Sequence, residues 1–305
     1  MYAVGLHDKM ATSYRRRKPR TGSTAIPFLI TILISMIVLG SIAYYFYGKI
    51  KHKNVNLEPM KSAVTSISEN DINEVLFVLK PTTENRLPAV MLLRFDPIRK
   101  QEYCVGIPLD LTMKYEGREE TVQQCLDNRG INNLKNALAA TLDQKIDRYM
   151  QLDSAGFHQL IGLIGNVQYL VTIRDTGLHE ADTSQMLDST QFETLLTSTH
   201  YYDEAERANV IGFSVAALLN QCDGQRIADN LDGYFSSIIN KVTTNITNMD
   251  YSNHCHAIKF VFSNALAPAR GMGVTCDNNN GKMYVNEYFI ESMKRSFSQS
   301  TQDAG

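Results

Sequence analysis

The chain lacks the short motifs by which the commonest nucleotide-binding and hydrolytic enzymes are identified. It has no phosphate-binding GxxxxGK followed by Ser or Thr, no dinucleotide-binding GxGxxG, no zinc-protease HExxH and no hydrolase GxSxG. It also has no internal repeat and no low-complexity tract. Hydrophobic residues make up 44% and charged residues 20% of its 305 positions, which is typical of a globular protein. The length suits one medium-sized domain with additional segments.

Charged side chains are missing from Thr21 to Gly48, and this run indicates a membrane-spanning helix. It exceeds the roughly 20 apolar residues that a helix needs to cross a bilayer, and three tyrosines lie at its far end, where an interfacial aromatic belt is expected. The basic cluster at 15–20 is stronger than the one at 49–53, which predicts a cytoplasmic N-terminus. A cleaved signal peptide is the alternative, because Ser41-Ile42-Ala43 has small residues at cleavage spacing, but the length of the run favours a retained anchor.

Beyond the anchor, acidic residues outnumber basic residues. Residues 1–53 carry nine Lys and Arg against one acidic residue, whereas residues 54–305 carry 21 Lys and Arg against 31 Asp and Glu. This acidic balance argues against nucleic acid as a partner. The anchor predicts instead that the protein lies in the cell membrane, with its main domain outside the cytoplasm.

Cysteines are few, and their odd number excludes a simple disulfide framework. They are Cys104, Cys125, Cys222, Cys255 and Cys276. One pair, Cys255 with Cys276, is possible in an oxidising compartment, and ordinary buried thiols are the alternative. The sequence His254-Cys255-His256 is the only metal-like cluster, but no third ligand follows at suitable spacing, so we predict no metal site there.

Apolar runs alternate with helical patterns after the anchor. Strands are expected at Glu74–Leu79, Ala89–Phe95, Gln101–Ile107 and Ala257–Phe262, helices at Ile131–Leu142, Tyr202–Gln221, Ile227–Thr244 and Tyr288–Phe297, and a loop over 174–190. This order predicts an α/β protein: an α-β-α sandwich with a mixed central sheet, preceded by one transmembrane helix. The expected segments are a basic tail at 1–24, the anchor at 25–48, a stalk at 49–72, the main domain at 73–248 and a packed C-terminal strand-and-helix extension at 249–305.

The stretch Thr141–Val171 predicts a strand, a helix and a second strand in succession. Asp153 and Ser154 are helix N-cap residue types, and Phe157 begins an apolar face that recurs at helical spacing up to Ile164. Gly165-Asn166 supplies a helix stop before the strand that follows.

An acidic residue, then Gly-Phe, an apolar helix, a glycine turn and a strand resemble the middle of the LytR-CpsA-Psr family. Its members are membrane-anchored cell-envelope proteins, and the active ones transfer glycopolymers from a polyprenyl-pyrophosphate carrier to the bacterial wall. The resemblance extends from about Glu74 to Thr247.

The motifs that carry the family's chemistry are only partly present. Where the family has Arg-Ser-Asp-Thr, this chain has Arg86-Leu87-Pro88-Ala89, and where the family has Ile-Pro-Arg-Asp, it has Ile107-Pro108-Leu109-Asp110. Farther on, the family's Arg-x-Arg corresponds to Thr197-Ser198-Thr199, and Arg207 is the arginine retained on the next helix. The resemblance therefore implies Asp110 and Arg207 as catalytic positions and Arg86 as a ligand-binding position, in a degenerate site.

Two functions follow from this pattern. In the first, the protein is catalytically degenerate and binds a polyprenyl phosphate lipid, a cell-wall polymer or an envelope enzyme. In the second, it is an active phosphotransferase that attaches glycopolymer to peptidoglycan, and only then would Mg²⁺ be required as a cofactor. The lost positions favour the first, because pyrophosphate recognition uses converging guanidinium groups, and leucine and proline cannot replace them.

Overall fold

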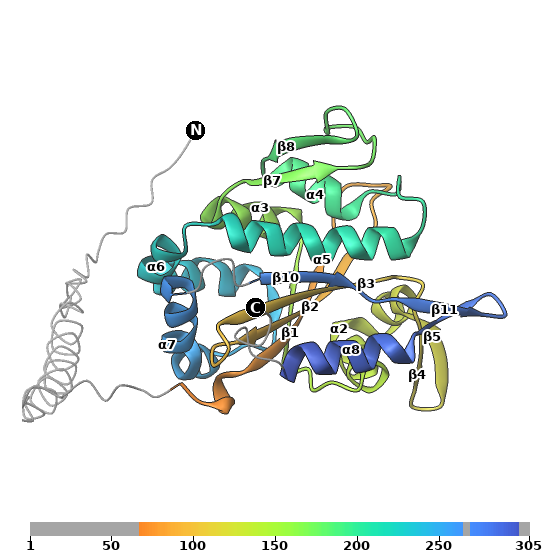
Figure 1. Cartoon of the computed structure of the whole chain (residues 1–305), viewed down its shortest axis with the longest axis horizontal. Helices are drawn as coiled ribbons and strands as arrows, with labels where there is room; N and C mark the ends of the chain where they lie inside the picture. Colours follow the sequence, from red (N-terminus) through yellow and green to blue (C-terminus); the bar gives the residue numbers. More distant parts are fainter. Residues whose placement is uncertain (1–66, 265–268, 299–305) are drawn as a thin grey trace, which may run out of the picture. The chain divides into compact units, whose positions relative to one another are not determined.

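The computed structural model describes residues 67–264 and 269–298, and its centre is a six-stranded sheet (Figure 1). In spatial order the strands are β10 (Ala269–Gly273), β3 (Gln101–Ile107), β2 (Ala89–Asp96), β1 (Asn73–Leu79), β6 (Arg148–Leu152) and β9 (Thr243–Thr244). The pairs β10–β3 and β1–β6 are parallel, and the other three pairs are antiparallel. The predicted mixed sheet is therefore confirmed, as are its first three strands.

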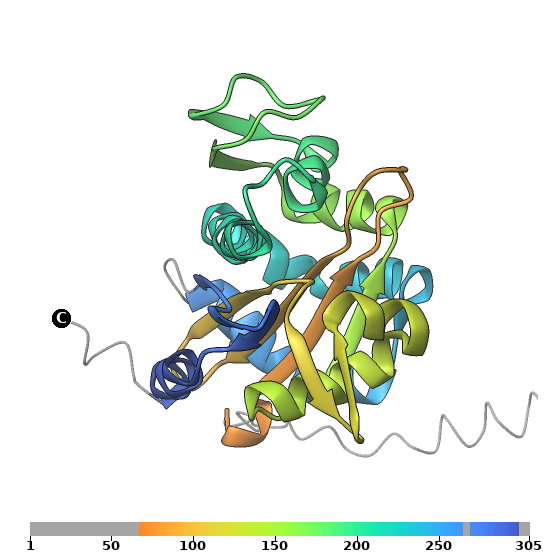
Figure 2. The same ribbon diagram turned by 90° about the vertical axis from the view of Figure 1, so that its right-hand side faces the viewer.

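Helices cover both faces of this sheet (Figure 2). On one face Leu76 and Val78 of β1 pack with α2 (Val122–Leu142) and α8 (Glu287–Ser298). On the other face Phe77 and Leu79 pack with α3 (Ser154–Ile164), α4 (Ser189–Thr197) and α5 (Glu204–Gln221). Alternate residues of one strand point to opposite faces, so a nearly continuous apolar run is needed where both faces are covered.

Helix α2 follows a short hairpin of β4 (Thr112–Tyr115) and β5 (Arg118–Thr121), and it is interrupted once. The Thr121 hydroxyl accepts from the backbone N–H of Gln124, and the Gln124 side chain accepts from the backbone N–H of Thr121. Gly130 has φ 76°, a conformation that glycine adopts at little cost and that breaks the helix. The predicted helix Ile131–Leu142 is the part beyond this break.

The central strand–helix–strand unit is confirmed as β6, α3 and β7 (Val167–Val171). Asp153 caps α3 by accepting from the backbone N–H of Gly156, and Gly165 ends it with φ 127°. However, β7 does not join the central sheet. It pairs with β8 (Thr183–Leu187) in a separate two-stranded sheet, so the loop expected over 174–190 contains a strand. Only Gln185 and Leu187 of β8 are buried, and this short polar strand gave no apolar pattern.

The C-terminal residues contain the clearest difference from expectation. Helix α6 (Gly224–Ile238) ends in a 3₁₀ turn, η2 (Ile239–Lys241), and packs on α7 (Asn248–Asn264). The run Ala257–Phe262, expected as a strand, lies inside α7. Its buried residues are Ala257 and Val261, four positions apart on one helix face, and a short apolar run does not distinguish strand from helix.

After α7 the chain returns to the sheet as β10, forms a hairpin of β11 (Cys276–Asn279) and β12 (Lys282–Val285), and ends in α8. Met293 and Phe297 place α8 on the core, which confirms the predicted closing helix. His254 and His256 lie in α7, where both imidazoles approach Asp71 at the end of the 3₁₀ turn η1 (Glu69–Asp71). The five cysteines are unpaired.

None of the helices within the described ranges is long and apolar enough to cross a membrane. The predicted anchor at 25–48 and most of the predicted stalk lie outside those ranges.

Helix α5 lies against β3 and β10 at backbone distance, because glycines line the contact. A Cβ atom on Gly212 of α5 would lie 2.0 Å from the carbonyl oxygen of Met272, and one on Gly106 of β3 would lie 1.9 Å from that of Ala208. Gly271 and Gly273 of β10 leave equally little room. We call these four residues the glycine seam. No other residue fits there without moving the helix away from the sheet.

The same face of β3 carries a buried carboxyl group, that of Glu102. Its side chain is 6% exposed, and its Oε2 atom has no hydrogen-bond partner. Desolvation raises the pKa of Glu102 from its ordinary value of 4.5 to about 7. The folded protein thus retains a proton that the unfolded chain releases, and stability falls as the pH rises from about 4.5 to 7.

We predict that Gly212→Ala lowers the free energy of unfolding by about 3 kcal/mol or more, because the new methyl group meets backbone atoms that cannot rotate away. The matched control is Gly233→Ala in α6, where a Cβ meets nothing within 4 Å. It should raise stability by up to about 1 kcal/mol through helix propensity. Thermal unfolding followed by circular dichroism measures the stability of both variants. Equal changes of stability in the two would show that Gly212 is not in tight contact with the sheet.

We predict that Glu102→Gln leaves stability nearly unchanged at pH 5 and raises it by about 3 kcal/mol at pH 8, where the wild-type protein must hold a buried charge. Unfolding curves at both pH values test this, with the exposed Glu291→Gln as control. A gain that did not grow with pH would show that Glu102 is not protonated in the folded state.

Candidate functional site

Three loops and the start of α5 meet where β1 leads into β2, and the positions implied by the family resemblance lie around this place. The loops are 80–88 between β1 and β2, 172–182 between β7 and β8, and 198–203 between α4 and α5. Loop 80–88 is tied to α4 by the backbone N–H of Leu87, which donates to the carbonyl of Thr197 at 2.9 Å. Loop 80–88 is therefore held between the strands that it joins and the end of α4.

Arg207 is among the largest fully buried side chains, with 1% exposure. Its Nε and Nη2 atoms donate to the two carboxylate oxygens of Glu204 at 2.9 and 2.7 Å. Its Nη1 atom donates to the carbonyl oxygens of Pro88 and Leu196 at 2.9 and 3.1 Å. A guanidinium has five N–H donors, so nearly all its capacity is used inside the protein. Arg207 joins α5, α4 and loop 80–88.

Asp110 lies close to this pair but on its outer side. The backbone N–H of Leu109 donates to Oε2 of Glu204 at 3.0 Å, which connects the end of β3 to the start of α5. Desolvation and the negative charges of Glu204 and Asp203 raise the pKa of Asp110 above its ordinary value. Asp110 is exposed and borders a cavity of about 250 Å³ that it shares with β5 and the β11–β12 hairpin.

Arg86 lies in a second cluster, formed with Asp175, Ser198 and His200, which we call the Asp175 cluster. The guanidinium of Arg86 holds both oxygens of Asp175, with Nη1–Oδ2 at 2.5 Å and Nη2–Oδ1 at 3.1 Å. The Ser198 hydroxyl donates to the same Oδ2 atom, and Nδ1 of His200 lies 3.2 Å from it. Desolvation alone would raise the pKa of Asp175, but the hydrogen bonds from Ser198 and Arg86 and the charge of Arg86 lower it. This carboxylate stays ionised.

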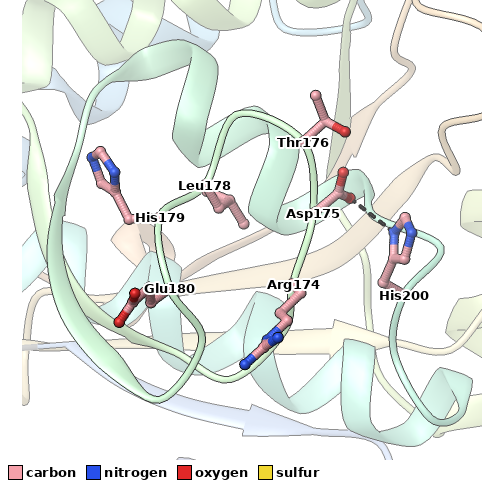
Figure 3. Close-up of a pocket in the computed structure, with 7 residues that line it drawn as sticks. All are labelled: Arg174, Asp175, Thr176, Leu178, His179, Glu180 and His200. Atoms are coloured by element: carbon pink, nitrogen blue, oxygen red, sulfur yellow. Dashed lines mark hydrogen bonds and ion pairs between the residues drawn. The ribbon is translucent and has the colours of Figure 1, made fainter.

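The Asp175 cluster forms part of the wall of the larger cavity of this region, about 750 Å³ in volume (Figure 3). The lining residues are Arg174, Asp175, Thr176, Leu178, His179, Glu180 and His200. All but His200 come from loop 172–182. Figure 3 shows the side chains of Asp175 and His200 directed toward each other, with Arg174 and His179 on other parts of the loop. The wall carries both signs of charge, which suits a polar ligand with anionic groups.

The sequence thus placed Arg86, Asp110 and Arg207 in one region, but the structure divides them between two neighbouring clusters. Their proposed roles stay predictions. Glu204 was missed although it lies three positions before Arg207 on one helix, the spacing of a helical ion pair. Asp175 was missed because it is 89 residues from Arg86 and no local pattern marks it.

The family resemblance implies a divalent metal only for an active enzyme, and the residues present do not fit one. Across the described ranges, no group of three or more His, Cys, Asp and Glu side chains is placed to hold a metal ion. Pro88 stands where the family has an aspartate and cannot serve as a ligand.

Comparisons with known proteins show the fold. No family model matches the sequence, and no curated protein matches it. Among solved structures, a Eubacterium siraeum protein provisionally named a transcription regulator aligns over 76% of this chain and 95% of its own, with a TM-score of 0.66 and 17% identity. TagV of Bacillus subtilis covers 74% of this chain and 95% of its own, with a TM-score of 0.55 and 15% identity.

TagT, solved in complex with a ligand designated LI-WTA, covers 76% of this chain and 93% of its own, with a TM-score of 0.56 and 15% identity. TagV and TagT are proteins of the LytR-CpsA-Psr family. The chain therefore shares its fold with these proteins, and the resemblance found in the sequence holds at the level of the fold.

We predict that Arg207→Ala lowers the free energy of unfolding by about 3–5 kcal/mol, because it leaves the Glu204 carboxylate and two buried carbonyl groups without their donor. Arg118→Ala, at an exposed position of β5, is the control and should change stability by less than about 0.5 kcal/mol. Thermal unfolding distinguishes this structural role from a purely catalytic one, in which Arg207→Ala would unfold at the wild-type temperature.

Proposed function

We propose that this protein is an extracytoplasmic cell-envelope protein, held by an N-terminal membrane span, that binds a polyprenyl-pyrophosphate-linked glycopolymer without transferring it. The observation that carries the proposal is that the two retained arginines are already hydrogen-bonded to groups of the chain itself. Arg207 donates to Glu204 and to two carbonyl groups, and Arg86 donates to Asp175. Both retained guanidinium groups are neutralised by carboxylates of the chain itself.

Transfer of a phosphoryl-linked polymer requires more positive charge than this site offers. The transition state develops charge on phosphate oxygens, and guanidinium groups or metal ions aimed at those oxygens stabilise it. Here Leu109 replaces one family arginine, and Thr197 and Thr199 replace two others. Binding is less demanding, because a mixed polar wall can hold sugars and phosphates through individual hydrogen bonds.

The fold supports a ligand of this class. TagT, whose fold this chain shares at a TM-score of 0.56, was solved with LI-WTA bound. The cavity of about 750 Å³ has room for a headgroup, and its wall carries Arg174, His179 and His200 as hydrogen-bond donors. The acidic balance of residues 54–305 is the reason that we propose no role in binding nucleic acid.

The second candidate is an active phosphotransferase, and Asp110 is the observation that favours it. Asp110 matches the family's aspartate and is exposed beside a cavity. A working enzyme would need a metal ion there, with Asp203 or Glu204 turning toward Asp110. The two candidates therefore differ in their dependence on metal and in turnover.

We predict that the full-length chain in detergent binds a short-chain polyprenyl pyrophosphate with a dissociation constant that EDTA changes less than twofold, and that no product forms on prolonged incubation. Calorimetry measures the binding, and ³¹P NMR measures the product. Arg86→Ala should weaken binding at least tenfold, because it removes the bidentate guanidinium that lies behind Asp175 in the cavity wall. Arg295→Ala, on the opposite face of the sheet, is the control.

Metal-dependent turnover that Asp110→Asn abolishes would replace the proposal with the enzyme. Absence of binding to polyprenyl pyrophosphate and to isolated wall polymer alike would refute both candidates.

A further inference from the structure

The carboxylate of Asp175 lies where donors from two other loops converge. Arg86 comes from loop 80–88, whereas Ser198 and His200 come from loop 198–203. Asp175 itself belongs to loop 172–182, and its side chain is 3% exposed although most of its loop neighbours are exposed. The contact is therefore made between separate parts of the chain and is not a local turn.

These donors make the arrangement that a phosphate group requires. A guanidinium that holds two oxygens side by side fits a carboxylate and a phosphate equally well, and a hydroxyl and an imidazole add further donors to one of those oxygens. The backbone also contributes to the position of the cluster, because the N–H of His200 donates to the Ser198 hydroxyl at 3.1 Å. Ser198 directly follows α4, and the N–H of Leu87 holds loop 80–88 to the carbonyl of Thr197 in α4, so α4 anchors the donors, whereas the acceptor is carried by loop 172–182.

We propose that Arg86, Ser198 and His200 form a phosphate-binding site that Asp175 occupies in this structure as an internal competitor. A phosphate of the incoming ligand displaces the carboxylate, and loop 172–182 moves away from the site. This inference rests on the proposed function, since it assigns the regulation of ligand binding at the same cavity.

Competition from the Asp175 carboxylate lowers the affinity for a phosphate ligand below the value that Arg86, Ser198 and His200 would give in its absence. A ligand that must first displace a bound carboxylate has an apparent affinity reduced by the fraction of molecules in which the site is open. A mono-anionic group gains little from the exchange, whereas a pyrophosphate brings more charge and more oxygens. The Asp175 carboxylate therefore selects for ligands with a diphosphate group.

The test uses inorganic pyrophosphate and the full-length chain. Asp175→Asn keeps the size of the side chain and removes its charge, and it should bind pyrophosphate at least tenfold more tightly than the wild-type protein. Asp182→Asn, in the same loop but outside the cluster, makes the same change of charge and should bind like the wild type. The double variant Asp175→Asn with Arg86→Ala should lose the gain.

A second measurement uses the wild-type protein alone, so it does not depend on the folding of a variant. Saturating pyrophosphate should increase amide hydrogen exchange in residues 172–182 and leave residues 73–79 of β1 unchanged. An unchanged loop, or equal affinities of Asp175→Asn and Asp182→Asn, would overturn the proposal.

The outcomes separate this inference from the proposed function. If the wild-type chain binds the polyprenyl carrier while Asp175→Asn gains nothing for pyrophosphate, the carrier-binding function stands and the competitor is refuted. If Asp175→Asn gains affinity for pyrophosphate while no carrier or wall polymer binds, the anion site stands and the proposed function is refuted.

Discussion

The backbone contact between α5 and the sheet determines the rest of this structure. Gly106, Gly212, Gly271 and Gly273 remove the side chains that would separate the helix from β3 and β10. The glycines thereby fix the distance and the orientation of α5 relative to the sheet, so the first turn of α5 lies beside the end of β3. From that position Glu204 accepts from the backbone of Leu109, and Arg207 reaches the carbonyl of Pro88. The glycines allow the backbone of α5 to touch the sheet near the middle of the helix, and this contact positions the charged residues at its start.

The second constraint is the buried ion pair of Glu204 and Arg207 at the start of α5. It depends on the glycine contact, which positions that end of the helix. An ion pair removed from water is tolerated only when its geometry is good and its remaining donors are satisfied. Arg207 meets this condition because Glu204 and two carbonyl groups are held rigidly around it. Acidic residues at Asp203, Glu204 and Glu206 also lie at the positive end of the helix dipole, which stabilises them. The pair therefore serves the fold, and it keeps the guanidinium away from the cavity.

The sequence predicted the elements that are long and regular and failed where the pattern was short. The strands β1, β2 and β3 and both ends of α3 followed from apolar runs, a capping aspartate and a glycine, whereas the first part of α2, before Gly130, was not predicted. The helical state of Ala257–Phe262 did not follow either, because so short a run, with five apolar residues and Lys259, satisfies either period, and most of α7 lies before it. For the site, the resemblance located Arg86, Asp110 and Arg207, but their partners are set by the tertiary structure. Asp175 lies in a polar loop that nothing in its neighbourhood distinguishes.

Each retained arginine of this site meets a carboxylate of the chain, but the two pairs differ in how they are held. Glu204 and Arg207 lie on one turn of one helix, and Arg207 is buried and also donates to two carbonyl groups, so a ligand would have to break several internal hydrogen bonds to reach it. Asp175 and Arg86 lie on two loops, and their pair can open without loss of secondary structure. The Arg86 pair is therefore easier for a phosphate to open than the Arg207 pair. Of the two guanidinium groups, the one on a loop is the more accessible to a ligand, and the binding function that we propose depends on this difference.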